Sequence, residues 1–248
     1  MYNDRIMDYS IIIYILFGII PSLVWLFYYL RKDAHPEPKG MVLKIFLWGA
    51  LITLPVFFVQ IGLLYLLDKT DINTLMKDII YWFFIISFSE EFFKYLVTKV
   101  KVVNSPHLDE PLDVMLYAVV VALGFTAVEN ILYLFVPTGQ MSFNQLIDRA
   151  LIISFIRFIG AVFLHTLCSA VIGYSMAISF CEAKRKHISI AIGMLVAVLL
   201  HGLYDFSIMT LDGYLKIAVP VIVIITLAIF VFYGFEKLKK MKSICKIN

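Results

Sequence analysis

The strongest constraint in this sequence is a series of seven long apolar runs. Their approximate ranges are 9–30, 41–67, 78–98, 113–136, 148–180, 188–209 and 215–235. Each is near or above the ~20 residues that a helix needs to cross ~30 Å of hydrocarbon. Since a chain in lipid must satisfy its backbone hydrogen bonds internally, such runs favour spanning helices. We therefore predict an all-α polytopic membrane protein with about seven transmembrane helices, in which residues 1–248 form a single domain.

Composition excludes the soluble classes. The chain is 62% hydrophobic and 16% charged, whereas soluble domains are about 45–50% apolar and about 25% charged. The net charge of +3 is small and the basic residues fall in loops, which argues against nucleic-acid binding.

The three cysteines are odd in number and lack CxxC spacing, so we predict neither disulfides nor a cysteine metal site. The fifth run is long for a straight crossing and is expected to tilt or to begin as an interfacial segment.

Lysine and arginine are distributed unequally between the two sets of connecting loops. The richer side holds fourteen: Arg31, Lys32, Lys39, Lys44, Lys99, Lys101, Lys184, Arg185, Lys186, Lys237, Lys239, Lys240, Lys242 and Lys246. The poorer side holds five: Arg5, Lys69, Lys77, Arg149 and Lys216. Because cytoplasmic loops carry the excess of these residues, we predict that the N-terminus is outside and the C-terminus cytoplasmic.

Eight ionisable side chains lie inside the predicted spans: Glu90, Glu91, Lys94, Glu129, Arg157, His165, His201 and Asp205. An acid or base at mid-membrane costs ~2.5–3.5 kcal/mol on insertion scales, so the six acids and bases left unpaired would cost ~15–20 kcal/mol. They must therefore face one another or a water-filled cavity. A salt-bridge knot that only fixes helix packing is the alternative to a functional site. The span boundaries place Glu90 and His165 nearer the inner half of the membrane and Glu129 and His201 nearer the outer half, a mismatch that indicates either wrong boundaries or a cavity that spans the bilayer.

Helical spacing sorts these residues into pairs. Glu90 and Lys94 are four positions apart and are expected to pair, whereas Glu91 points ~100° away round the helix. One glutamate is therefore expected to act in the site while the other anchors it. His201 and Asp205 are also four apart, so the carboxylate is predicted to orient the imidazole.

A second polar face follows further along the chain. Thr126, Glu129, Asn130 and Tyr133 have the spacing of one stripe on an otherwise apolar helix. Arg157 is interpreted as a counter-ion, with Glu129 as its expected partner.

The acids in the spans outnumber the bases by two when the histidines are neutral. A low-dielectric site does not hold that excess unaided. Protonated carboxyls, an imidazolium or one divalent metal would each relieve it. His165, His201 and Glu91 have the donor types that suit zinc, while glutamate and histidine also activate water without a metal. The sequence leaves these alternatives open.

Five motifs in order along the chain resemble the PrsW family of intramembrane proteases, relatives of the type II CAAX prenyl endopeptidases and of the gamma-secretase subunit APH-1. They are the loop YYLRKDAHPEPKG (Tyr28–Gly40), the EExxK of Glu90–Lys94, the GFxxxEN of Gly124–Asn130, the histidine of FLHTLCS (Phe163–Ser169) and the HxxxD of His201–Asp205. The likeness covers nearly the whole chain. It implies a protease of the bacterial cytoplasmic (inner) membrane that cuts a membrane-anchored anti-sigma factor and so frees an extracytoplasmic-function (ECF) sigma factor.

The resemblance also implies roles for individual residues. Glu90 or Glu91 would activate the attacking water together with His165. His201, with Asp205, would stabilise the oxyanion or serve as a second metal ligand.

The chain departs from the CAAX-type pattern at two places. It has Lys94 where those enzymes carry arginine, and Glu129 with Asn130 where they carry a histidine. Their mechanism therefore transfers only in part.

Other functions compete with an intramembrane endopeptidase. The APH-1 likeness allows a non-catalytic scaffold or substrate-presenting subunit, and the CAAX likeness allows a prenyl protease. A proton-coupled or metal transporter would also use buried acids and histidines. Against the transporter, the sequence has no inverted repeat and no pair of Gly/Pro-broken helices.

Overall fold

The computed structural model describes residues 2–32, 35–103, 105–136, 141–181 and 186–241, and the regular structure within these ranges is all helical. The α-helices are α1 (Tyr2–Leu30), α2 (Lys39–Asp68), α3 (Thr74–Ile79), α4 (Ser89–Lys101), α5 (Pro111–Leu134), α6 (Phe143–Arg157), α7 (Phe163–Cys181), α8 (Lys186–Thr210) and α9 (Leu215–Lys239). Two segments are π-helical, η1 (Ile80–Phe88) and η2 (Phe158–Val162). The all-α prediction is confirmed.

Six helical segments of the described chain are long and apolar enough to cross a membrane. They are Ile11–Leu30, Lys39–Asp68, Pro111–Leu134, Phe143–Phe180, His187–Thr210 and Leu215–Lys239. The protein is therefore a multi-pass membrane protein. The remaining predicted span, 78–98, is helical throughout, but the charges of Glu90, Glu91 and Lys94 lower its apolar character. That this segment also crosses the membrane stays a prediction.

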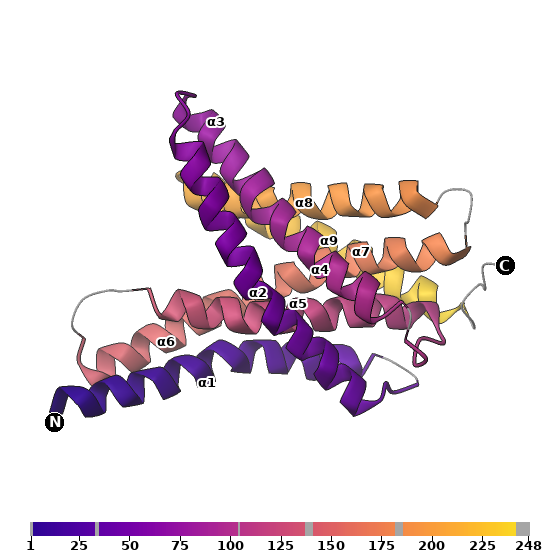
Figure 1. Cartoon of the computed structure of the whole chain (residues 1–248), viewed down its shortest axis with the longest axis horizontal. Coiled ribbons are helices and arrows are strands. Elements are labelled where there is room, and N and C mark those ends of the chain that lie inside the picture. The colour runs from indigo at the N-terminus through magenta and orange to yellow at the C-terminus, as the bar shows by residue number, and fades with distance from the viewer. Residues whose placement is uncertain (1, 33–34, 104, 137–140, 182–185, 242–248) are drawn as a thin grey trace.

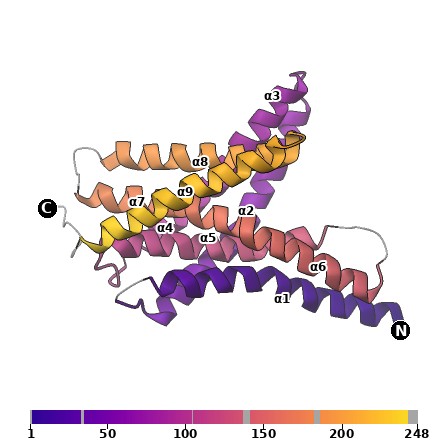
Figure 2. The ribbon, with the colours of Figure 1, turned by 180° about the vertical axis from the view of Figure 1, so that it is seen from behind.

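The helices form an alternating bundle. Because α3, η1 and α4 follow one another without a break, as do α6, η2 and α7, the described chain forms seven continuous helical segments. Successive segments run in opposite directions, so that α1 begins and α9 ends at opposite ends of the molecule (Figures 1 and 2). An odd number of crossings requires this arrangement. Which end faces the cytoplasm stays a prediction, and four residues used for it, Lys184, Arg185, Lys242 and Lys246, lie outside the described residues.

Helix α5 is the centre of the bundle. It packs against α1, α2 and α7, and every residue from Pro111 to Ala127 is buried. An evenly apolar helix of this kind belongs inside a protein rather than at its lipid surface. Its start is fixed by a capping box in which the Asp113 Oδ2 oxygen accepts the backbone N–H of Glu110 at 2.7 Å, and by Pro111 in the first turn.

Glycines allow α2 and α5 to cross closely. A Cβ on Gly49 would overlap the carbonyl oxygen of Val121, and one on Gly124 would overlap the carbonyl oxygen of Phe46. Small residues permit such backbone contacts between membrane helices, where van der Waals packing drives association. This crossing fixes α2, and with it one wall of the polar site.

The π-helical segments lie next to the intramembrane charges. Segment η1 ends at Phe88, just before Glu90 and Glu91, and η2 separates Arg157 from His165. A π-turn changes the phase of a helix, and such turns are frequent at functional sites. The fifth predicted span is one continuous helical path of 38 residues, Phe143–Phe180, with η2 within it.

Replacing Gly49 by alanine should destabilise the α2–α5 crossing. The added methyl group meets backbone, so we expect a loss of ~1–3 kcal/mol in the free energy of unfolding, measured by thermal and denaturant unfolding in detergent. Gly62→Ala is the matched control in the same helix, because nothing lies within 4 Å of a Cβ at that position. Equal stability of the two variants would contradict the close crossing.

Candidate functional site

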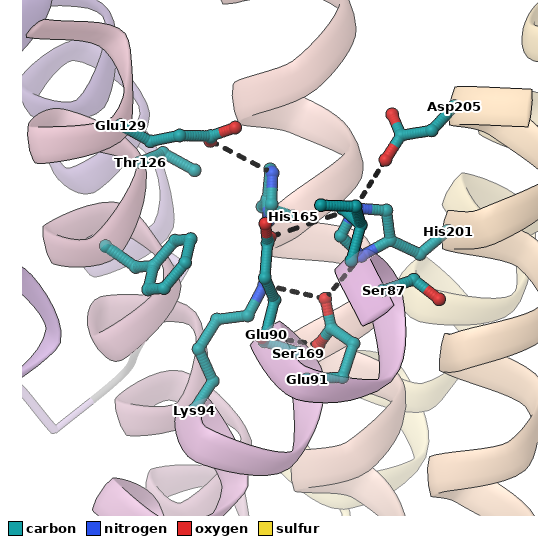
Figure 3. A network of polar contacts seen from close by, with 12 residues as sticks. Ser87, Glu90, Glu91, Lys94, Thr126, Glu129, His165, Ser169, His201 and Asp205 are labelled. Carbon is teal, nitrogen blue, oxygen red and sulfur yellow. Dashed lines mark hydrogen bonds and ion pairs between the residues drawn. The ribbon is translucent and has the colours of Figure 1, made fainter. Parts of the chain in front are cut away.

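The eight intramembrane ionisable residues form one cluster inside the bundle. Figure 3 labels all of them except Arg157. They come from five helices: Glu90, Glu91 and Lys94 from α4, Glu129 from α5, Arg157 from α6, His165 from α7, and His201 and Asp205 from α8. The sequence predicts that these charges face one another, and the structure confirms it.

Two imidazoles and one carboxylate converge at the middle of the cluster. The rings of His165 and His201 lie edge to face, with centroids 4.7 Å apart. The Glu90 Oε2 oxygen lies 3.7 Å from His165 Nδ1 and 4.0 Å from His201 Nε2. This oxygen is buried and has no hydrogen-bond partner among the described residues. A buried acceptor left free in this way is costly, so its position between two imidazoles identifies the chemical centre of the cluster.

Both carboxylate oxygens of the other glutamate, Glu91, have polar partners. The Glu91 Oε1 oxygen accepts hydrogen bonds from Lys94 Nζ at 2.6 Å and from His201 Nδ1 at 2.9 Å, and Ser169 Oγ lies 3.5 Å from its Oε2. Glu91 and Lys94 are 0% and 1% exposed. The predicted pairing of Lys94 with Glu90 is therefore wrong. A helical lysine reaches positions i−3 and i−4 alike, and here Lys94 and Glu91 both point toward α7 and α8.

The remaining predicted pairs are confirmed. The guanidinium of Arg157 lies 2.8 Å from Glu129 Oε2, and its Nε–H donates to Asn130 Oδ1. His201 Nε2 lies 3.2 Å from Asp205 Oδ2. Glu129, Arg157 and Asp205 are partly exposed, whereas His201 is buried.

The contacts within the cluster favour wrong span boundaries as the reason for the mismatch in depth. His165 Nε2 lies 3.2 Å from Glu129 Oε2, and the His165 ring contacts that of His201, so all of these residues lie at one level with Glu90. The fifth continuous helical segment begins at Phe143, before the predicted start at residue 148, and the helices cross obliquely (Figure 1). The number of residues between a side chain and a predicted span boundary therefore does not give its depth in the membrane.

A cavity of about 260 Å³ opens onto part of this cluster. Its polar lining includes Thr53, Gln60, Glu90, Glu129, Arg157, His165 and Asp205. Its apolar and aromatic lining includes Phe57, Tyr81, Trp82, Phe125 and Tyr133. Glu91, Lys94 and His201 do not line it, so the two neighbouring glutamates face different surroundings. The volume is ample for several waters, each of which occupies about 30 Å³ in the liquid.

The residues present fit a divalent metal. One ligand atom from each of Glu90, His165 and His201 lies within 4.8 Å of the others, and imidazole and carboxylate donors suit zinc. The free Oε2 of Glu90 would gain a partner, and the two excess negative charges would be neutralised. In the sequence-based set Glu91 takes the place of Glu90. The structure places Glu91 instead at the far nitrogen of His201, where a carboxylate orients a metal-binding imidazole.

Comparison with known proteins identifies the family. The family model described as PrsW family intramembrane metalloprotease matches residues 37–233. The chain belongs to this family. All eight clustered residues fall within the matched range. Protease PrsW of Bacillus subtilis is 28% identical over 92% of this chain and 94% of its own length. The Oceanobacillus iheyensis protein of the same name is 29% identical over 84% and 88%, and that of Geobacillus kaustophilus 30% over 79% and 80%. No solved structure matches the chain significantly.

Membership of the PrsW family decides between an intramembrane protease and the functions that compete with it. The protein is an intramembrane protease, which excludes the non-catalytic scaffold and the transporter as its main function. The description as a metalloprotease agrees with the fit of the Glu90, His165 and His201 group to a metal.

Sequence reasoning missed two polar residues of α2 that line the cavity, Thr53 and Gln60. Gln60 of α2 lines the cavity and contacts Glu90. Its signal in the sequence is an amide in a predominantly apolar run, and it does not stand out there because an amide carries no charge.

Breaking the Lys94–Glu91 pair should destabilise the protein strongly. Lys94→Met leaves a buried carboxylate without its main counter-ion, and we expect a loss of ~3–5 kcal/mol in the free energy of unfolding. Adding Glu91→Gln should recover a large part of it, because the uncompensated charge is then removed. Denaturant unfolding of both variants in detergent measures this coupling. Lys99→Met, at an exposed position of the same helix, is the control, and a double variant no more stable than Lys94→Met would contradict the pairing.

Proposed function

We propose that this protease hydrolyses a membrane-anchored anti-sigma factor in a bacterial cytoplasmic membrane and thereby frees an ECF sigma factor. The observation that carries an endopeptidase function is the convergence of Glu90, His165 and His201 beside a cavity within the membrane-spanning bundle. Hydrolysis in a membrane requires enclosed water, a group that accepts its proton and a group that stabilises the oxyanion. The substrate class rests on the family resemblance rather than on the geometry.

We assign the proton-accepting role to Glu90. Glu90 lines the cavity, and its Oε2 oxygen lacks a donor, so this oxygen is free to accept a proton from a water, with His165 Nδ1 3.7 Å away. Glu91 is a poor candidate because Lys94, His201 and Ser169 already engage its oxygens. In this assignment Glu91 anchors the site and orients His201, as predicted for one of the two glutamates.

We further propose that a bound metal is held by His165, His201 and Glu90, with Glu90 Oε2 as a ligand. The proton-accepting role assigned above to this oxygen applies to the site without a metal. A zinc ion bound there would supply a Lewis acid that polarises the peptide carbonyl and makes water a better nucleophile. On the side away from Glu90, each imidazole has a nitrogen beside a carboxylate, Glu91 for His201 and Glu129 for His165, and these would hold the rings in orientation. The nitrogens on the side of Glu90 Oε2 have partners of their own: Asp205 lies 3.2 Å from His201 Nε2 and Lys94 Nζ lies 2.7 Å from His165 Nδ1. A metal bound by these two nitrogens would replace both contacts.

The proposed orientation places the N-terminus outside and the C-terminus in the cytoplasm. The excess of lysine and arginine on one set of loops supports it. The start of α1 and the end of α9 lie at opposite ends of the bundle, which is consistent with it. A sigma factor freed on the cytoplasmic side could then reach its polymerase without crossing the membrane.

Glu90→Gln and Glu91→Gln should fail in different ways. Glu90→Gln removes the free acceptor, so we expect kcat to fall by about 10²–10⁴ with little change in the unfolding temperature. Glu91→Gln leaves Lys94 buried without a counter-ion and should lower the unfolding temperature as well. Cleavage of a full-length anti-sigma factor from the same genome, reconstituted in proteoliposomes, gives the rates. Glu236→Gln, at the exposed end of α9, is the control.

Retained cleavage by Glu90→Gln would contradict the assignment to Glu90. No cleavage of any anti-sigma factor by the wild type, with cleavage of a prenylated CAAX peptide, would replace the proposed substrate by the CAAX class.

Metal content tests the proposed zinc site separately. We expect about one zinc per purified chain by mass spectrometry, and loss of cleavage on adding a chelator, restored by zinc. His165→Ala and His201→Ala should lower the zinc content, whereas His187→Ala, at the exposed start of α8, should not. Full activity of a metal-free sample would instead establish a water activated by glutamate and histidine alone.

A further inference from the structure

Gln60 is an isolated amide in a lipid-facing helix. Between Lys44 and Tyr65 of α2, Thr53 and Gln60 are the only hydroxyl or amide side chains. The neighbouring residues Val59 and Ile61 are exposed on the apolar surface of α2. An amide placed in an apolar environment is costly unless its hydrogen bonds are made. The partners of Gln60 therefore indicate what the amide does.

Both amide hydrogens of Gln60 are directed at the helix that carries the paired glutamates. The Nε2 atom donates to Glu90 Oε1 at 3.1 Å and to Ser89 Oγ at 3.2 Å. Ser89 can accept because its own hydroxyl donates to the Ile85 carbonyl. A side-chain amide has two N–H donors, and both are used here. The opposite orientation of the amide would set its carbonyl oxygen against a carboxylate oxygen.

These bonds distinguish the two oxygens of Glu90. Oε1 is held by Gln60, whereas Oε2 has no donor and lies toward His165 and His201. We infer that Gln60 is a positioning residue that fixes the Glu90 carboxylate with one oxygen directed at the reaction centre. This inference rests on the role proposed above for Glu90.

The neutrality of the amide suits this role. A lysine or arginine at the same place would make a charge-assisted bond, which is roughly twice as strong as a neutral one, and would compete with the centre for the negative charge of Glu90. An amide fixes the orientation of the carboxylate and leaves its charge available. The bond also links α2 to α4 across the wall of the cavity, so the position of Glu90 depends on a helix that contributes none of the eight ionisable residues.

The test compares Gln60→Met with Ile61→Met. Gln60→Met keeps the length of the side chain and removes both donors, while Ile61→Met changes the neighbouring, 49% exposed residue without touching the site. We expect Gln60→Met to lower kcat for the reconstituted anti-sigma factor about 10–100-fold, the usual range for partners of ligands and catalytic groups. KM and the unfolding temperature should match those of Ile61→Met. Gln60→Asn keeps the amide with one methylene less reach and should have an intermediate kcat.

Zinc affinity provides a second readout that is independent of the substrate. In competition with a chromophoric chelator, Gln60→Met should bind zinc about 10–100-fold more weakly than Ile61→Met. Equal kcat and equal zinc affinity of the two variants would overturn the inference. A fall in kcat that follows the unfolding temperature would also overturn it, because Gln60 would then be structural.

The outcomes separate this inference from the proposed function. Cleavage by the wild type and its loss in Glu90→Gln test the function alone. If both hold while Gln60→Met behaves as Ile61→Met, only the positioning role fails.

Discussion

The structure depends on the mutual neutralisation of charges that lipid cannot accommodate. The eight ionisable residues of the cluster come from five helices, and most of their contacts join different helices. Each such contact is therefore also a restraint on packing. The contacts of Glu129 with Arg157 and His165 fix α5 against α6 and α7, and the contact of Glu91 with His201 fixes α4 against α8. The cost of burying one unpaired charge is comparable with the whole stability of a small protein, so these restraints are strong. The glycine crossing of α2 and α5 then adds the last wall of the site.

Two adjacent glutamates can take opposite roles because a helix turns ~100° per residue. Glu91 faces α7 and α8, where Lys94 and Ser169 engage it. Glu90 faces the cavity and the amide of Gln60. Both carboxylates nevertheless approach the same imidazole, Glu91 at Nδ1 and Glu90 on the side of Nε2. One residue pair thus supplies both the support of His201 and the free oxygen beside it.

Sequence alone predicted the parts of this arrangement that depend on short-range geometry or on the cost of burial. The apolar runs predicted the helices, and the expense of charge in lipid predicted that the eight residues meet. The i,i+4 spacing predicted the pairing of His201 with Asp205, and charge balance predicted that of Glu129 with Arg157. The choice of Glu91 over Glu90 by Lys94 was not predictable, because both lie within reach and the neighbouring helices decide. The contact of Gln60 with Glu90 spans thirty positions and depends on how α2 crosses the bundle.

Leaving the Glu90 Oε2 oxygen without a hydrogen-bond partner lowers the stability of the fold, but the proposed activity requires this oxygen to be free. A half-satisfied polar network in a low-dielectric interior is less favourable than a complete one, and an unsatisfied buried acceptor costs ~1–3 kcal/mol. Lys94 lies on the next turn of the same helix and would satisfy this oxygen if it turned from Glu91. It is held away by the 2.6 Å bond to Glu91 and by His165 Nδ1 at 2.7 Å. The bonds that fix Lys94 therefore also keep the Glu90 oxygen free, so the structural pair and the reactive group depend on each other.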